Sequence, residues 1–265
     1  MTLPQILKDL QRFVQSDFDD QELLKIKKEV SRYSDEEILI ATLKVLPTKS
    51  QINRVKIEEN HDSIVELTND AAHGHIIHRA SSLSRLSTGD AMYLRSQVIM
   101  KLQGLACTLE NDHNIKLILK CGYRKPTVQA QAFDDAYQIA KQKLEHLWED
   151  VVYGYANLSV ADPDIAAHPT GGAVDVSLFD LTSQRELDFW GWDFPNGSIK
   201  NLSLLFMNWR DLSLEQIKNR LFLAKHMVKA GFWLFPGEFW HYSTGDAESA
   251  AGLNQDVAVY AQQEF

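Results

Sequence analysis

Two short stretches organise this chain: His168-Pro-Thr-Gly-Gly-Ala-Val-Asp175 and Glu238-Phe-Trp-His241. Together they contain two imidazoles and two carboxylates. Zinc accepts such a set, with three protein ligands, an open fourth position for water and one nearby carboxylate that moves protons. We therefore interpret the two stretches as one site, and the rest of the chain as the scaffold that brings them together.

Within the first stretch, the Pro-Thr-Gly-Gly segment lets the chain fold back between His168 and Asp175. A loop imidazole and a strand carboxylate can then face the same point, with His241 as a third ligand and Glu238 near the metal's water. From spacing alone an alternative stays open. In that alternative the histidines are ordinary hydrogen-bonded residues and the carboxylates pair with lysine or arginine.

A third segment places an arginine at the edge of the predicted sheet. Ile115 to Leu119 is a short β-branched and leucine run, typical of a buried strand. Cys121-Gly-Tyr-Arg124 follows it, and Pro126 then opens a helix predicted to reach about Trp148. Arg124 therefore lies on a strand-to-helix turn, where binding groups collect. From the residues alone, a salt bridge that holds the loop explains it equally well.

Size and composition limit the function. The chain has 265 residues and 30.2 kDa, with 45% hydrophobic residues and a net charge of −9. This charge argues against binding to nucleic acid or to anionic membranes. Cys107 and Cys121 stand in no metal-type spacing and indicate reduced thiols. An acidic residue in the N-terminal segment and the lack of a long apolar run predict a cytoplasmic protein; export by a non-standard route stays open.

The scaffold is predicted to have two parts, a helical N-terminal extension over residues 1–50 and a main domain over residues 51–265. Residues 1–50 read as three short helices. We expect them to pack against the main domain, and the alternative is a docking or regulatory module. Capping boxes predict helix starts at Ser34 and Ser213. A helix is predicted over about 89–111, and the histidine-rich run 73–78 is predicted to be a loop. The aromatic stretch 189–197 is either a lid or a packed surface loop.

The three motifs resemble those of the D-alanyl-D-alanine dipeptidase family, the zinc peptidases of vancomycin-resistance type. That family shows Ser-x-His-x-x-Gly-x-Ala-x-Asp, a later Glu-x-Trp-His and an earlier Gly-Tyr-Arg. Here they stand as Ala166-Ala-His-Pro-Thr-Gly-Gly-Ala-Val-Asp175, Glu238-Phe-Trp-His241 and Gly122-Tyr-Arg124. Their order and separation fit the family over about residues 60 to 245, and the first fifty residues lie outside the resemblance.

The resemblance implies His168, Asp175 and His241 as ligands of one Zn²⁺ per chain, Glu238 as the catalytic base and Arg124 as the transition-state stabiliser. It also implies an α+β fold. In that fold a small antiparallel sheet with flanking helices holds the zinc site, and here the N-terminal helical extension precedes it.

Four departures from the family pattern concern the substrate. Ala166 replaces the first serine, and Cys121 stands where the dipeptidases often carry aspartate. Lys125 separates the arginine from the proline. The Gly-Tyr-Arg-x4-Gln form, which ends at Gln129, and the His-x-Thr-Gly form look more like the related zinc D,D-carboxypeptidases. The zinc chemistry survives these changes, whereas the choice of substrate does not follow securely.

Three functional hypotheses result. The first is a zinc dipeptidase that hydrolyses D-Ala-D-Ala or a related D-amino-acid dipeptide by Glu-assisted attack of zinc-bound water. The second is a zinc D,D-carboxypeptidase that acts on peptidoglycan stem peptides. The third is a non-catalytic zinc-binding module. The expected partner is a small dipeptide or a peptidoglycan-derived peptide, with no nucleic acid and no membrane; homo-oligomerisation is left open.

Overall fold

A mixed sheet forms the centre of the protein in the computed structural model, which describes residues 1–68, 74–189 and 205–264. Its strand order is β3-β5-β6-β9-β8, and β7 pairs with β6. Two further two-stranded sheets pair β1 with β10 and β2 with β4. The strands are β1 (Lys56–Ile57), β2 (Ile64–Glu66), β3 (Ile76–His78), β4 (Tyr93–Arg95), β5 (Ile115–Cys121), β6 (Ala173–Asp180), β7 (Arg185–Glu186), β8 (Trp233–Leu234), β9 (His241–Ser243) and β10 (Val257–Ala258).

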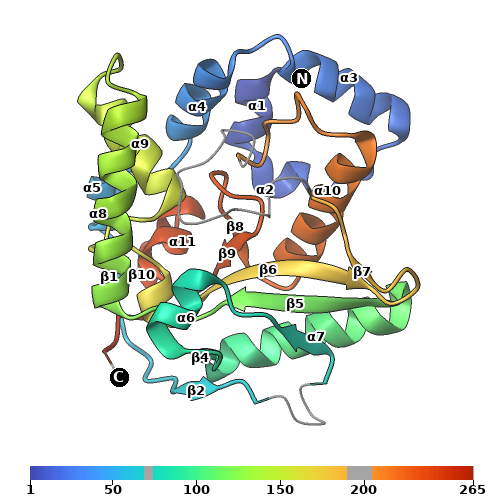
Figure 1. Cartoon of the computed structure of the whole chain (residues 1–265). Helices are drawn as coiled ribbons and strands as arrows, with labels where there is room; N and C mark the ends of the chain where they lie inside the picture. Colours follow the sequence, from blue (N-terminus) through green and yellow to red (C-terminus); the bar gives the residue numbers. More distant parts are fainter. Residues whose placement is uncertain (69–73, 190–204, 265) are drawn as a thin grey trace.

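Helices cover both faces and one end of this sheet. Figure 1 shows α7 on one side of β5 and β6, α10 and the N-terminal helices on the other side, and α8 with α9 at one end. The helices are α1 (Leu3–Lys8), α2 (Leu10–Phe13), α3 (Asp20–Val30), α4 (Asp35–Leu43), α5 (Lys49–Ile52), α6 (Ser82–Thr88), α7 (Ser96–His113), α8 (Pro126–Lys143), α9 (Glu149–Ser159), the 3-10 turn η1 (His168–Thr170), α10 (Leu214–Lys229) and α11 (Ala247–Gly252). The predicted α+β class is confirmed.

The two central strands form because their sequences are apolar on both faces. Leu117–Leu119 in β5 is fully buried, and Val174 and Val176 in β6 are also at 0% exposure. Such continuous burial is typical of a strand with a covering layer on each side. The prediction of an antiparallel sheet is wrong for one pair of strands in the central sheet, since β3 runs parallel to β5.

Local signals at helix ends are confirmed. Ser34 and Ser213 each accept a hydrogen bond from the backbone three residues on, and a glutamate or glutamine side chain returns to the cap. This reciprocal bonding satisfies donors that a helix start leaves open. Gly231, with φ of 88°, follows α10 as expected of a residue just past a helix end.

Three predictions fail, and a fourth lies almost entirely outside the described residues. The helix expected over about 89–111 begins only at Ser96, because Tyr93–Arg95 pairs with Ile64–Glu66 as a strand. Part of the histidine-rich run is strand β3 rather than loop, since Ile76–His78 pairs with β5. The helix after Pro126 ends at Lys143, short of Trp148. Residues 190–197 of the aromatic stretch lie outside the described residues.

The N-terminal helices pack into the same hydrophobic core as the rest of the chain. The buried side chains of α1 belong to one cluster with those of β6 and α10. The Gln11 side chain exchanges two hydrogen bonds with the backbone of Leu234, at 2.7 and 3.0 Å. Phe13 lies against Trp209, with ring centroids 6.1 Å apart. The expected packing against the main domain is therefore present; the boundary at residue 50 stays a prediction.

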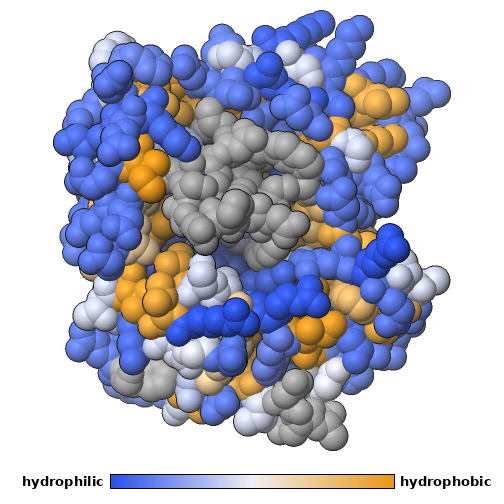
Figure 2. Space-filling view, in the orientation of Figure 1, coloured by the Kyte–Doolittle hydropathy of each residue, from blue (hydrophilic) through white to orange (hydrophobic). Residues whose placement is uncertain are grey.

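The face of the protein seen in the space-filling view (Figure 2) is mostly polar. Figure 2 shows one face that is largely hydrophilic, with separate hydrophobic patches. Among the described residues, no helix combines the length and the apolar character needed to cross a bilayer.

Candidate metal centre

A row of polar side chains crosses the three central strands. Asp175 of β6 pairs in register with His241 of β9 on one side and with Cys121 of β5 on the other. Residues directly opposite each other in antiparallel strands project to the same face. The register therefore presents a thiol, a carboxylate and an imidazole side by side, at the end of the sheet where the chain enters β6.

His168 joins this row from the turn that precedes β6. Its Nδ1 donates a hydrogen bond to the Gly122 carbonyl at 2.7 Å, and its Nε2 lies 3.3 Å from Asp175 Oδ1. The first contact fixes the tautomer, so that Nε2 carries the free lone pair when the ring is neutral. Gly171 ends the turn with φ of 74°, a conformation that favours glycine.

The second motif brings its side chains to the same carboxylate. His241 Nδ1 lies 2.9 Å from Asp175 Oδ1, and the two histidine rings are 4.8 Å apart, edge to face. The His241 amide bonds back to the Glu238 carbonyl in a tight turn. Ligand atoms of Asp175, Glu238 and His241 consequently all lie within 4.8 Å of one another.

The donor set fits a zinc ion. Zinc holds nitrogen and oxygen ligands at about 2.0–2.2 Å in tetrahedral geometry, so two such ligands lie roughly 3.3–3.5 Å apart. The distance of 3.3 Å between His168 Nε2 and Asp175 Oδ1 agrees with this spacing. His168, Asp175 and His241 are between 5 and 8% exposed, and both imidazoles contact the same oxygen of Asp175, at 3.3 and 2.9 Å. The roles assigned to these residues stay predictions.

Electrostatics in the cluster centre on Asp175. Burial raises the pKa of this carboxyl, but His168 and His241 outweigh burial and hold the pKa well below its usual range. Burial also lowers the pKa of His168, but the charge of Asp175 prevails and raises it to about 10. For His241, burial dominates and lowers the pKa. One imidazole therefore carries a proton beside an ionised carboxylate when no metal is bound.

Arg124 lies next to the same carboxylate. Its Nη2 is 3.8 Å from Asp175 Oδ2, and its Nη1 donates to Gln129 Oε1 at 2.8 Å. Gln129 is fixed in turn by its bond to the Ala161 carbonyl at 2.6 Å. The buried Nε of Arg124 has no hydrogen-bond partner among the described residues. The guanidinium is thus held in place and retains a donor for another group. The contact with Asp175 is also the salt bridge of the alternative reading, and the catalytic role of Arg124 stays a prediction.

Residues outside the three sequence motifs hold the turn that carries His168. Arg95 is 2% exposed, donates to the Thr170 carbonyl at 2.7 Å and contacts both oxygens of Glu59 at 2.9 and 3.0 Å. The C-terminal segment adds the Gln263 amide, which bonds to the Pro169 carbonyl at 2.9 Å. The sequence reading missed these contacts, because the buried arginine and the C-terminal segment belong to no motif.

Two buried groups near the centre also escaped prediction as site residues. The sequence reading noted Cys121 only as a departure from the family pattern. It forms a second group with His168 and Asp175, whose ligand atoms lie within 4.8 Å of one another. Glu248 of α11 is 4% exposed, and burial raises its pKa to about 8. The position of Cys121 directly before the Gly-Tyr-Arg motif could have identified it as a site residue. No sequence pattern identified Glu248.

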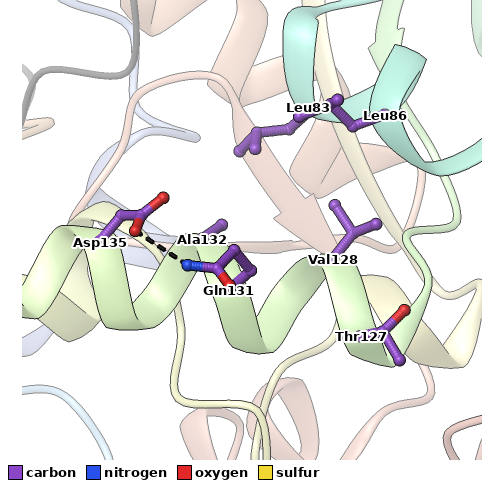
Figure 3. A pocket seen from close by; sticks show the side chains of 7 residues that line it. All are labelled: Leu83, Leu86, Thr127, Val128, Gln131, Ala132 and Asp135. Atoms are coloured by element: carbon purple, nitrogen blue, oxygen red, sulfur yellow. Dashed lines mark hydrogen bonds between the residues drawn. The ribbon is translucent and has the colours of Figure 1, made fainter.

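An open groove of about 270 Å³ lies apart from the candidate metal centre. Figure 3 shows Leu83 and Leu86 of α6 facing Val128 and Ala132 of α8 across it, with a Gln131–Asp135 hydrogen bond along its floor. None of the five predicted site residues lines it. The groove therefore gives no alternative location for the chemistry.

A buried set of imidazoles and carboxylates beside a fixed arginine fits a metal-dependent hydrolase. The family follows from the sequence match. A family model described as D-ala-D-ala dipeptidase matches residues 86–263, and the chain belongs to this family of peptidases. The resemblance drawn from the three motifs is confirmed. No curated protein matches the chain.

Proposed function

We propose that this peptidase is a zinc enzyme that hydrolyses D-Ala-D-Ala or a related D-amino-acid dipeptide. The single observation that carries the proposal is that His168 and His241 both contact one buried oxygen of Asp175, at 3.3 and 2.9 Å, in a chain of this family. Glu238 joins the same cluster, and Arg124 lies beside it. A structural zinc site needs neither of these last two residues.

Each residue then has a physical task. Bound zinc supplies Lewis-acid chemistry, which polarises a carbonyl and makes water more acidic. His168 and His241 would hold the ion as neutral imidazoles, and the Gly122 carbonyl keeps the ring of His168 oriented. Asp175 contributes one negative charge to the ion.

The proton is carried by Glu238. Its carboxylate oxygen accepts a proton from the attacking water and passes it to the leaving amine. As the carbonyl carbon becomes tetrahedral, its oxygen gains negative charge. The guanidinium of Arg124 stabilises that charge, because it remains protonated and projects planar donors in a fixed direction. Its hydrogen bond to Gln129 holds it in that direction.

The experiment that tests the proposal is Glu238→Gln in zinc-loaded protein. We expect one zinc per chain in both proteins and loss of hydrolysis of D-Ala-D-Ala in the variant. Equal turnover by variant and parent would show that Glu238 does not move the proton. Equal zinc content with no turnover by either protein would favour a zinc module without catalysis.

A D,D-carboxypeptidase is the second candidate, and one observation favours it. The Arg124–Gln129 hydrogen bond gives a structural role to the Gly-Tyr-Arg-x4-Gln pattern, in which the chain resembles those enzymes. Incubation with free D-Ala-D-Ala and with a pentapeptide that ends in D-Ala-D-Ala separates the two. Release of terminal D-alanine from the pentapeptide alone would reject the dipeptidase proposal and support the carboxypeptidase.

A further inference from the structure

Cys121 occupies the metal-facing row of the sheet. It is 0% exposed and stands opposite Asp175, which in turn stands opposite His241. Its Sγ, one nitrogen of His168 and one oxygen of Asp175 all lie within 4.8 Å of one another. Thiolate sulfur binds zinc as readily as imidazole nitrogen does. The chain therefore places a further strong donor beside His168 and Asp175, and Asp175 also belongs to the group that contains Glu238 and His241.

An irregularity in β5 creates this placement. Leu119 pairs with Val176, but Cys121 rather than Lys120 pairs with Asp175, so Lys120 is an extra residue in the strand. A β-bulge of this kind re-aims the side chains that follow it, and bulges are common beside active sites. Lys120 pairs with Glu186 at 2.8 Å. In a regular strand Lys120 would stand opposite Asp175 in place of the thiol.

The surroundings of the sulfur also suit a thiolate. Arg124 directs Nη2 to Cys121 Sγ at 3.7 Å, which places a fixed positive charge beside the sulfur. Cationic neighbours of this kind stabilise the form of cysteine that binds metals. We infer that Cys121 is a fourth protein ligand of the metal centre, which takes a thiophilic divalent cation such as zinc, cobalt or cadmium. This inference rests on the proposed function, because it assumes the ion held by His168, Asp175 and His241.

The required movement is small. Around a tetrahedral zinc ion, sulfur at about 2.3 Å and nitrogen at about 2.0–2.1 Å lie roughly 3.5–3.6 Å apart. The ligand atoms of Cys121, His168 and Asp175 lie within 4.8 Å of one another, so sulfur and nitrogen would approach by at most about 1.3 Å on binding an ion. When the sulfur–metal bond forms, the thiol proton goes to solvent. Four protein donors then fill the resting shell, so hydrolysis requires either a fifth coordination position or release of the sulfur.

X-ray absorption at the zinc edge tests the inference without a mutation at the site. We expect a sulfur scatterer at about 2.3 Å in zinc-loaded wild-type protein, beside nitrogen and oxygen at about 2.0–2.2 Å. Cys107 is the matched control, because it is the other cysteine of the chain and is exposed. Cys107→Ser should keep the sulfur shell, and Cys121→Ser should lose it. Cobalt-loaded proteins should show the same pattern in the thiolate-to-cobalt charge-transfer band.

The outcomes separate this inference from the proposed function. A zinc-loaded wild-type protein without a sulfur shell overturns the inference and leaves the proposed function intact. A sulfur shell that persists in Cys121→Ser also overturns it. Failure of the wild-type protein to take up zinc overturns both. Cys121→Ser that retains one zinc per chain but lacks the sulfur shell supports both, because the remaining three ligands hold the ion.

Discussion

The hydrogen bond between Arg124 and Gln129 allows the role of the arginine to be tested quantitatively. Both side chains are buried, at 5 and 1% exposure, and Nη1 lies 2.8 Å from Oε1. Arg124→Lys removes the planar donors, and loss of one such donor typically costs about 100- to 1000-fold in kcat. Gln129→Met keeps the volume but removes the acceptor. A hydrogen bond to a charged group contributes about 1.5–3 kcal/mol, so this change lowers kcat by roughly 10- to 150-fold at most.

The double variant is the decisive measurement. If Gln129 acts only by orienting Arg124, substitution of Gln129 should not lower kcat further once Arg124 has been replaced. We therefore expect Arg124→Lys with Gln129→Met to be about as slow as Arg124→Lys alone, in single-turnover hydrolysis with zinc content measured in parallel. A double variant whose loss in kcat equals the product of the two single losses would show that Gln129 does not act through Arg124. So would loss of zinc from Gln129→Met, since that residue contacts none of the predicted ligands.

Three further changes probe the metal centre and its support. His241→Ala should lose both zinc and stability, because metal binding and folding are linked; unchanged zinc content by metal analysis would reject it as a ligand. Arg95→Met leaves the Glu59 carboxylate without the buried cation that contacts both its oxygens, and should reduce the free energy of unfolding by about 3–5 kcal/mol in urea. A loss below about 1 kcal/mol would mean that the pair is as weak as a surface ion pair. The pKa of Glu248 is raised from 4.5 to about 8 by burial, so its stabilising effect is complete below pH 4.5 and is lost as the pH rises through 8. Thermal unfolding of metal-free protein should therefore decline less steeply between about pH 5 and 9 in Glu248→Gln than in wild type; identical profiles would contradict this.

Features that depend on neighbours in sequence were predictable. The capping boxes at Ser34 and Ser213 involve residues three apart, so the sequence contains all the partners of each bond. The runs at Ile115 and Ala173 are apolar enough to be strands whatever they pair with. The three motifs likewise sit where turns between regular elements are expected, and this makes His168, Asp175 and His241 visible as one set.

Features that depend on distant partners were not predictable. Residues 93–95 look helical in isolation, but pairing with residues 64–66 makes them a strand. The parallel pairing of β3 with β5, and of β1 with β10, follows from the path of the chain in space. The two- and three-residue strands β1, β3 and β10 are too short to show it in their sequence. The buried role of Arg95 depends on the same long-range contacts, since its partners lie in three separate segments.

The bulge at Lys120 shows how such a distant feature controls the chemistry. Local sequence predicts β5, but only the pairing of β5 with β6 decides whether Lys120 or Cys121 faces Asp175. The observed register puts two positively charged groups, the His168 imidazolium and Arg124, around one carboxylate in the metal-free protein. A metal ion that enters this cluster displaces the proton of His168 and takes over its contact with Asp175. When the Cys121 thiol also gives up its proton, two protons leave as a divalent ion binds, and the net charge of the pocket does not change.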